Sequence, residues 1–170
     1  MAPISEVREP RVVVGVRDSA AARWALAWAI GEARLRRAPL LVVHVSSMPH
    51  NAGAAIGGAL PDLLATARAA GTVLANRLLE DVAGDALSDV RLSVLPLVGD
   101  PGRTLVDLAR EGDLLVIGAG SHGLVGRLVR PSVRRYCARH TRATLTCVRP
   151  PALESHTGSL TGTEHGHVID

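Results

Sequence analysis

The chain has 170 residues, a length that fits one domain with short tails and allows a sizeable buried core. Hydrophobic residues make up 47% of the sequence but aromatic residues only 2%, so the core must be built mainly from Leu, Val and Ala. All 19 basic residues are Arg, which excludes a P-loop lysine and Schiff-base chemistry, and the net charge of +3 is modest.

Residues 1–10 contain two Pro and several charges and are expected to form a loose lead-in. They lack the apolar core of a signal peptide, and no apolar run approaches the roughly 18 residues that suggest a membrane helix. We therefore expect a soluble, cytoplasmic protein that does not contact a membrane.

The first predicted strand, Arg11–Val16, is a continuous apolar run typical of a strand buried on both faces, and we expect it at the centre of a sheet. Residues 18–19 supply N-cap chemistry for a helix over residues 20–37. One face of this helix carries its large apolar residues, Trp24, Trp28 and Leu35. We expect the two tryptophans in the core or at an interface.

A second buried strand is predicted over Leu40–Val45, with His44 neutral and hydrogen-bonded inside the sheet. Residues 46–60 are rich in Gly and Ala and are predicted to form a flexible loop. A long helix over Pro61–Val82 follows, with apolar residues at three- and four-residue steps, and Gly84 is expected to close it.

The remaining elements continue the alternation of strands and helices. We predict a strand over 91–98, a short helix from Pro101, a strand over 114–117, a helix over 132–140 and a last strand over 143–148. Short connections and right-handed crossovers turn this order into an α/β fold, a doubly wound five-stranded parallel sheet. We expect a single domain over residues 11–149, a flexible tail over 150–170, and a crevice where the first and fourth strands end.

Gly118, Gly120 and Gly123 follow the fourth predicted strand and precede a helix. Glycines let backbone N–H groups approach a ligand closely, and the N-terminus of the next helix adds unpaired donors and a partial positive charge. No acidic residue occurs between Asp113 and Glu154, whereas seven arginines do: Arg127, Arg130, Arg134, Arg135, Arg139, Arg142 and Arg149. This stretch therefore predicts an anion site, above all for phosphates.

The stretch resembles the universal stress protein family, whose pattern is Gly, two residues, Gly, nine residues, Gly and then Ser or Thr. The same positions here hold Gly118, Ser121, Pro131 and Ser132. The segments VVVGVRDS, LLVVHV and LVGDPGRTLVDLAREGDLLVIG are similar to the family as well, so the resemblance covers residues 11–149. It implies the adenine-nucleotide α-hydrolase-like, Rossmann-like fold.

The resemblance also implies a regulatory protein in the stress response that binds ATP or another adenine nucleotide, with Mg as a companion ion, and has little or no turnover. It implies an adenine pocket near the ends of the first two strands and phosphates over the glycine turn. It further implies a homodimer paired through the last strand, Thr144–Val148, and protein partners that the sequence does not identify. The implied nucleotide-binding residues are Val16, Arg17, Asp18, Ser19, Val45, Gly118, Gly120, Ser121, His122, Gly123, Ser132 and Val133.

Three departures from the family pattern keep a second interpretation open. Pro131 has no N–H to donate, Ser121 replaces a glycine, and Arg17 stands where nucleotide-binding members have an Asp that contacts the nucleoside. The alternative is a dimeric stress protein of the same fold that binds no nucleotide and acts through protein partners. Nothing positions Ser121, His122 and Asp18 as a catalytic triad, so at most weak ATP hydrolysis is expected, and stacking aromatics that would indicate nucleic-acid binding are missing.

Cys137 and Cys147 lack a CxxC arrangement and are predicted to be reduced packing residues, one in a helix and one in a strand. The tail beyond Pro150 has several potential metal ligands but no fixed ligand spacing, so we predict no metal site. Those side chains are Glu154, His156, Glu164, His165 and His167.

Overall fold

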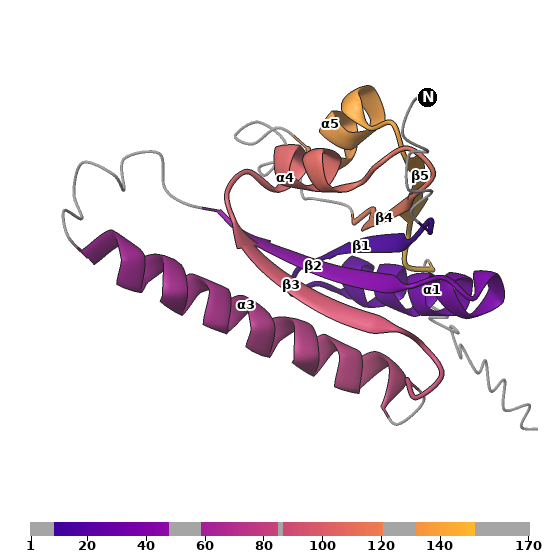
Figure 1. Ribbon diagram of the computed structural model, residues 1–170, viewed down its shortest axis with the longest axis horizontal. Helices are drawn as coiled ribbons and strands as arrows, with labels where there is room; N and C mark the ends of the chain where they lie inside the picture. The colour runs from indigo at the N-terminus through magenta and orange to yellow at the C-terminus, as the bar shows by residue number, and fades with distance from the viewer. Residues whose placement is uncertain (1–8, 48–58, 85–86, 121–131, 152–170) are drawn as a thin grey trace, which may run out of the picture.

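The structure, a computed structural model, describes residues 9–47, 59–84, 87–120 and 132–151. Strands and helices alternate along these residues (Figure 1). They are β1 (Val12–Val16), α1 (Ala20–Arg36), β2 (Leu40–Ser46), α3 (Leu60–Ala83), β3 (Leu92–Val98), α4 (Pro101–Leu108), β4 (Leu114–Gly118), α5 (Val133–His140) and β5 (Thr144–Val148). Every predicted strand and helix is therefore present, close to its predicted ends.

The five strands form one parallel sheet in the order β3-β2-β1-β4-β5. β1 lies at its centre, where Gly15 stands between Val43 of β2 and Ile117 of β4. α1 and α3 cover one face of the sheet and α4 and α5 the other (Figure 1). The predicted doubly wound α/β fold is confirmed, and its switch point lies between β1 and β4.

Two apolar layers enclose the central strand. Val12 and Val14 pack in the layer beneath α1 and α3, whereas Val13 packs in the layer beneath α4 and α5. All three are fully buried, which explains why this strand is continuously apolar instead of alternating. Burying one such side chain stabilises the fold by roughly 1.5–3 kcal/mol.

α1 buries a face made of alanines with Leu26 and Ile30, and leaves Trp24 and Leu35 outside. Ala25 and Ala29 are fully buried, so the helix backbone lies close to the sheet. Trp24 is 48% exposed and Leu35 is 81% exposed, while Trp28 is half-buried against the core. A core position for Trp24 is therefore wrong, because at 3.6 residues per turn Trp24 lies on the side of α1 opposite the face that packs on the sheet.

The two cysteines lie in different environments. Cys137 of α5 is fully buried, and its burial raises the pKa of the thiol to about 11. Cys147 of β5 is exposed, so its prediction as a packing residue is wrong. Both are free cysteines.

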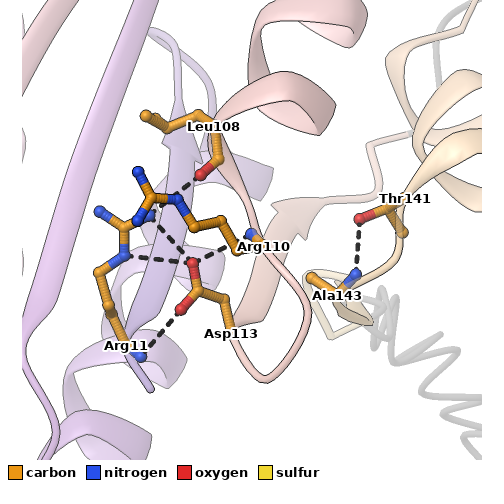
Figure 2. A network of polar contacts seen from close by, with 6 residues as sticks. All are labelled: Arg11, Leu108, Arg110, Asp113, Thr141 and Ala143. Atoms are coloured by element: carbon orange, nitrogen blue, oxygen red, sulfur yellow. Dashed lines mark hydrogen bonds and ion pairs between the residues drawn. The ribbon is translucent and has the colours of Figure 1, made fainter. Parts of the chain in front are cut away.

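A buried carboxylate joins β1 and β4 at the amino edge of the sheet, where the strands begin. Asp113 is 5% exposed and accepts hydrogen bonds from the backbone N–H, Nε and Nη2 of Arg11 at 3.0–3.1 Å (Figure 2). It also accepts from the backbone N–H of Arg110 at 3.1 Å, and Arg11 Nη2 donates to the Leu108 carbonyl at 3.0 Å. The buried charge is thus paired and hydrogen-bonded, as a stable interior requires.

Candidate functional site

The carboxyl ends of β1 and β4 meet the first turn of α1 in very close contact. A Cβ atom at Gly118 would lie 2.5 Å from the carbonyl oxygen of Ala21 and 2.9 Å from the backbone nitrogen of Ala22. A side chain here would force the backbone of α1 to shift, so this position strongly favours glycine. The predicted meeting of the first loop with the glycine turn is confirmed.

Arg17 lies beside that turn. A Cβ atom at Gly120 would lie 3.9 Å from Nη2 of Arg17, so the guanidinium group approaches the turn backbone. Arg17 is exposed and has no ion pair with another described residue. Its charge is therefore available at the glycine turn.

The neighbouring carboxylate points elsewhere. Asp18 accepts a hydrogen bond at 3.2 Å from Nη2 of Arg23, and the same nitrogen lies 3.6 Å from Asp81 of α3. Asp18 is thus paired along α1 instead of standing free for a ligand. Ser19 is also engaged, because its hydroxyl oxygen caps α1 by accepting from the Ala22 N–H at 3.2 Å.

α5 begins differently from the other short helix. Ser132 is its N-cap residue, but the Ser132 side chain makes no capping hydrogen bond, and the first intrahelical bond runs from the Tyr136 N–H to the Ser132 carbonyl at 3.0 Å. In α4, by contrast, the Asp100 carboxylate accepts from the Arg103 N–H at 2.8 Å. The hydroxyl of Ser132 and the first-turn N–H groups of α5, from Val133 onward, can therefore serve a ligand.

A histidine ties the end of β2 to the end of β1. His44 Nδ1 lies 3.0 Å from the Val16 carbonyl oxygen, and because a carbonyl only accepts, Nδ1 carries the hydrogen. This supports the predicted hydrogen bond within the sheet. The ring fits because α3 has Gly71 opposite it, where a Cβ atom would lie 2.8 Å from His44 Cδ2. Sequence reasoning missed Gly71, although a glycine inside a long helix was the available signal.

The predicted site residues are thus partly assembled. Val16, Arg17 and the Gly118–Gly120 turn lie together, and Val45 stands at the end of the adjacent strand, half-buried in the layer of α4 and α5. Three predicted site residues and one departure from the family pattern lie outside the described residues: Ser121, His122, Gly123 and Pro131. Binding of a ligand by any of these residues stays a prediction.

Hollows occur at the opposite, amino edge of the sheet. One of about 410 Å³ is lined by Arg34, Arg37, Asp89 and Arg91, among others. Its arginines are largely engaged, since Arg34 binds both carboxylate oxygens of Asp89 at 3.1 Å and Arg91 pairs with Glu9. This pairing disfavours it as an anion site.

The described part of the chain contains no helix that is both long and apolar enough to span a membrane. It likewise contains no group of three His, Cys, Asp or Glu side chains placed to hold a metal ion. The potential ligands of the tail, from Glu154 to His167, lie outside the described residues.

Residues 10–149 match the sequence model of the universal stress protein family. Two universal stress proteins of Mycobacterium tuberculosis, from the strains CDC 1551 / Oshkosh and ATCC 25618 / H37Rv, are each 32% identical to the chain over 142 residues. That alignment covers 81% of this chain and 46% of each relative. The chain thus spans about half the length of these curated relatives.

Solved structures share the fold. Universal stress protein UspA from Lactobacillus plantarum superposes with a TM-score of 0.61 at 21% identity, covering 84% of this chain and 99% of that chain. A universal stress protein from Archaeoglobus fulgidus gives a TM-score of 0.55 at 25% identity, covering 83% and 99%. One solved in complex with cAMP gives 0.52 at 24% identity, covering 83% and 97%. With a family match over most of its length and the same arrangement of strands and helices, the chain belongs to the universal stress protein family.

Proposed function

We propose that this protein is a regulatory member of its family that binds an adenine nucleotide where β1 and β4 end, with little or no turnover. The observation that carries the proposal is the placement of Arg17 Nη2 beside the Gly118–Gly120 turn. A planar guanidinium group and exposed backbone N–H groups are the donors that phosphate oxygens prefer. This edge of the sheet therefore suits a phosphate-bearing ligand.

The orientation of the nucleotide follows from the charges at this edge. Arg17 replaces the acidic residue that the family resemblance places against the nucleoside, and its guanidinium group approaches the turn where phosphates are expected. The nucleotide is thus held mainly by its phosphates, with the base near Val16 and Val45. A universal stress protein of the same fold has been solved with cAMP, so this fold accommodates an adenine nucleotide in that protein.

The residues around the site also suggest that the bound nucleotide is hydrolysed slowly or not at all. Asp18, the carboxylate nearest to the loop after β1 among the described residues, is paired with Arg23 and is poorly placed to act as a base. Mg²⁺ prefers oxygen ligands, and a carboxylate already engaged by a guanidinium group does not fit that role. We therefore propose binding in which Arg17, and not a metal ion, neutralises the phosphates.

The test is calorimetric titration of the purified protein with ATP, AMP and adenosine. We expect affinity to rise with the number of phosphates, and Arg17→Ala to weaken ATP binding by about tenfold, as for one lost charged hydrogen bond, while leaving adenosine unaffected. Absence of both heat and a thermal shift at millimolar nucleotide would refute nucleotide binding. Equal loss for ATP and adenosine would refute the role of Arg17.

A second candidate function is a dimer of the same fold that binds no nucleotide and acts through protein partners. The open outer edge of β5 favours dimer formation in either case, since β5 ends the sheet and contains no proline. We propose that two copies pair through Thr144–Val148. Nucleotide released from freshly purified, denatured protein would contradict the nucleotide-free alternative.

A further inference from the structure

An apolar stripe runs along the outer side of α1. Trp24, Trp28, Gly31 and Leu35 follow one another at four-, three- and four-residue steps and so lie on one side of the helix. Trp24 is 48% exposed and Leu35 is 81% exposed, and no charged residue interrupts the stripe. Large exposed apolar side chains gathered in this way indicate a contact surface.

The stripe faces away from α3 and towards β5. With 3.6 residues per turn, Arg23 and Trp28 lie on opposite flanks of the buried alanine face of α1. Arg23 reaches Asp81 of α3 at 3.6 Å, which fixes that flank beside α3. α1 also contacts β5 directly, and Trp28 and Val148 of β5 both pack on the same face of the sheet. The stripe therefore lies on the β5 side of α1.

The outer edge of β5 has free backbone groups. The Thr144 N–H donates to the Asp113 carbonyl at 3.1 Å, and the Ala119 N–H donates to the Val148 carbonyl at 2.7 Å. In a parallel ladder the residues bonded to β4 alternate with residues whose N–H and C=O groups point outward. Leu145 and Cys147 are therefore the residues of β5 whose backbone N–H and C=O groups point away from β4.

The opposite edge of the sheet lacks one outward donor. The Leu40 N–H donates to the Arg91 carbonyl, and the Gly99 N–H donates to the Ser46 carbonyl, both at 2.9 Å. By the same alternation, Pro96 belongs to the residues of β3 that face outward. Proline has no N–H to offer an added strand, so β3 is the poorer template for pairing and β5 the better one.

We propose that the α1 stripe packs against the same stripe of a second copy of this chain, above a seam of two antiparallel β5 strands. The inference rests on the β5 pairing proposed above and adds a second contact to it. A two-fold axis at the middle of β5 makes the two α1 helices antiparallel, so that Trp28 meets Trp28 of the second copy near the axis and Trp24 faces Leu35 of that copy. One patch then serves both copies, as a two-fold interface requires.

Distances across the seam explain why these side chains are large. Strands lie about 4.8 Å apart, so α1, which packs mainly on β1 and β4, lies about 10 Å from the axis and about 20 Å from its copy. A helix with its side chains is about 10–12 Å across, so alanine-sized residues would leave a gap of roughly 8–10 Å. Indole rings from both copies fill such a gap.

The charges on the other face of the sheet give this contact a further role. Partial burial raises the pKa of the Cys147 thiol, and Arg134 and Arg149 lie near enough to act in the opposite direction. Arginine therefore crowds the α5 side of the β5 edge, and a second copy brings the same charges to the seam. A β5 contact alone would be opposed by this repulsion, and the α1 stripe supplies the attraction.

The test compares dimer dissociation constants by sedimentation equilibrium in the full chain. We expect Trp24→Ala combined with Leu35→Ala to weaken the dimer at least about tenfold, since the pair of side chains meets twice across the two-fold axis. Val73→Ala is the matched control, because Val73 is 63% exposed on α3, far from the seam, and should change nothing. Cys147→Pro, which removes an outward N–H as Pro96 does in β3, should also weaken the dimer.

Two further measurements distinguish the outcomes. Trp24 and Trp28 are the only tryptophans, so emission should shift to shorter wavelength as the protein is concentrated, and added salt should tighten the dimer by screening the arginines. A dimer that is lost in Cys147→Pro but unchanged in the α1 variant would overturn this inference and leave β5 pairing intact. A monomer at all concentrations would overturn both, whereas the nucleotide titration tests ligand binding separately.

Discussion

At the amino edge of the sheet, Asp113 accepts hydrogen bonds from Arg11 and Arg110. At the carboxyl edge, by contrast, Arg17 forms no ion pair and the Ser132 side chain no capping hydrogen bond among the described residues. Both edges are polar and both join β1 to β4. The first completes its hydrogen bonds within the fold and so contributes to stability. The second keeps donors open next to two close-packed glycines and so is suited to a ligand.

The largest effect should come from the amino edge. Asp113→Ala removes a buried carboxylate and leaves Arg11 partly buried without its partner, which should lower the free energy of unfolding by about 3 kcal/mol in urea denaturation. Nucleotide affinity of the folded variant should not change. The control is Asp89→Ala, which breaks an exposed pair with Arg34 and should lower stability by at most about 1 kcal/mol. Equal losses would contradict the comparison.

Gly118→Ala should disturb the carboxyl edge in both stability and binding. The added methyl group meets the Ala21 carbonyl, and we expect a loss of about 2 kcal/mol together with loss of nucleotide binding. Gly31→Ala is the matched control, because a Cβ at Gly31 meets nothing within 4 Å, and a helix gains up to about 1 kcal/mol from this change. A Gly118→Ala protein with unchanged stability would show that this contact relaxes freely.

Gly71→Ala should have a smaller effect on the same edge. The new methyl group presses on the His44 ring and strains its hydrogen bond to the Val16 carbonyl, which should destabilise the fold by about 1 kcal/mol. In a His44→Ala background the penalty should shrink, and what remains should come from Pro96, whose Cβ would lie 3.2 Å from a Cβ at Gly71. A penalty of unchanged size without the histidine would disprove this explanation.

The smallest effect distinguishes the two serine caps. Ser19→Ala removes the bond to the Ala22 N–H and should lower stability by about 1 kcal/mol in thermal unfolding. Ser132→Ala removes no capping bond and should change stability by less than about 0.5 kcal/mol, but it should weaken nucleotide binding about threefold, as for one lost hydrogen bond. The reverse order of effects would mean that the carboxyl edge is structural as well.

Much of the fold could be predicted because its signals are local. Continuous apolar runs such as Val12–Val16 marked the strands, Ser19 marked the start of α1, and Gly84 marked the end of α3, where it has a φ of 49°. With strands and helices strictly alternating, handedness left few arrangements of the sheet to consider.

The rest depends on contacts between distant parts of the chain. Periodicity placed Trp24 on an apolar face of α1, but only the position of the sheet shows that the face with Leu26 and Ile30 is the buried one. The fit of Gly71 to His44 joins α3 to β2, and the pairing of Arg11 with Asp113 spans 102 positions. Arg17 is a further example. In the sequence it suggested only the loss of an acidic contact to the nucleoside, whereas the structure places its guanidinium group beside the glycine turn.

Pro96 also limits how far association can proceed. Because β3 lacks a backbone donor at Pro96, β5 is the better of the two edges for pairing. If two copies pair through β5 as proposed, each end of the ten-stranded sheet is a β3 edge interrupted by Pro96. Crowding of this protein should therefore yield closed pairs and not cross-β fibres.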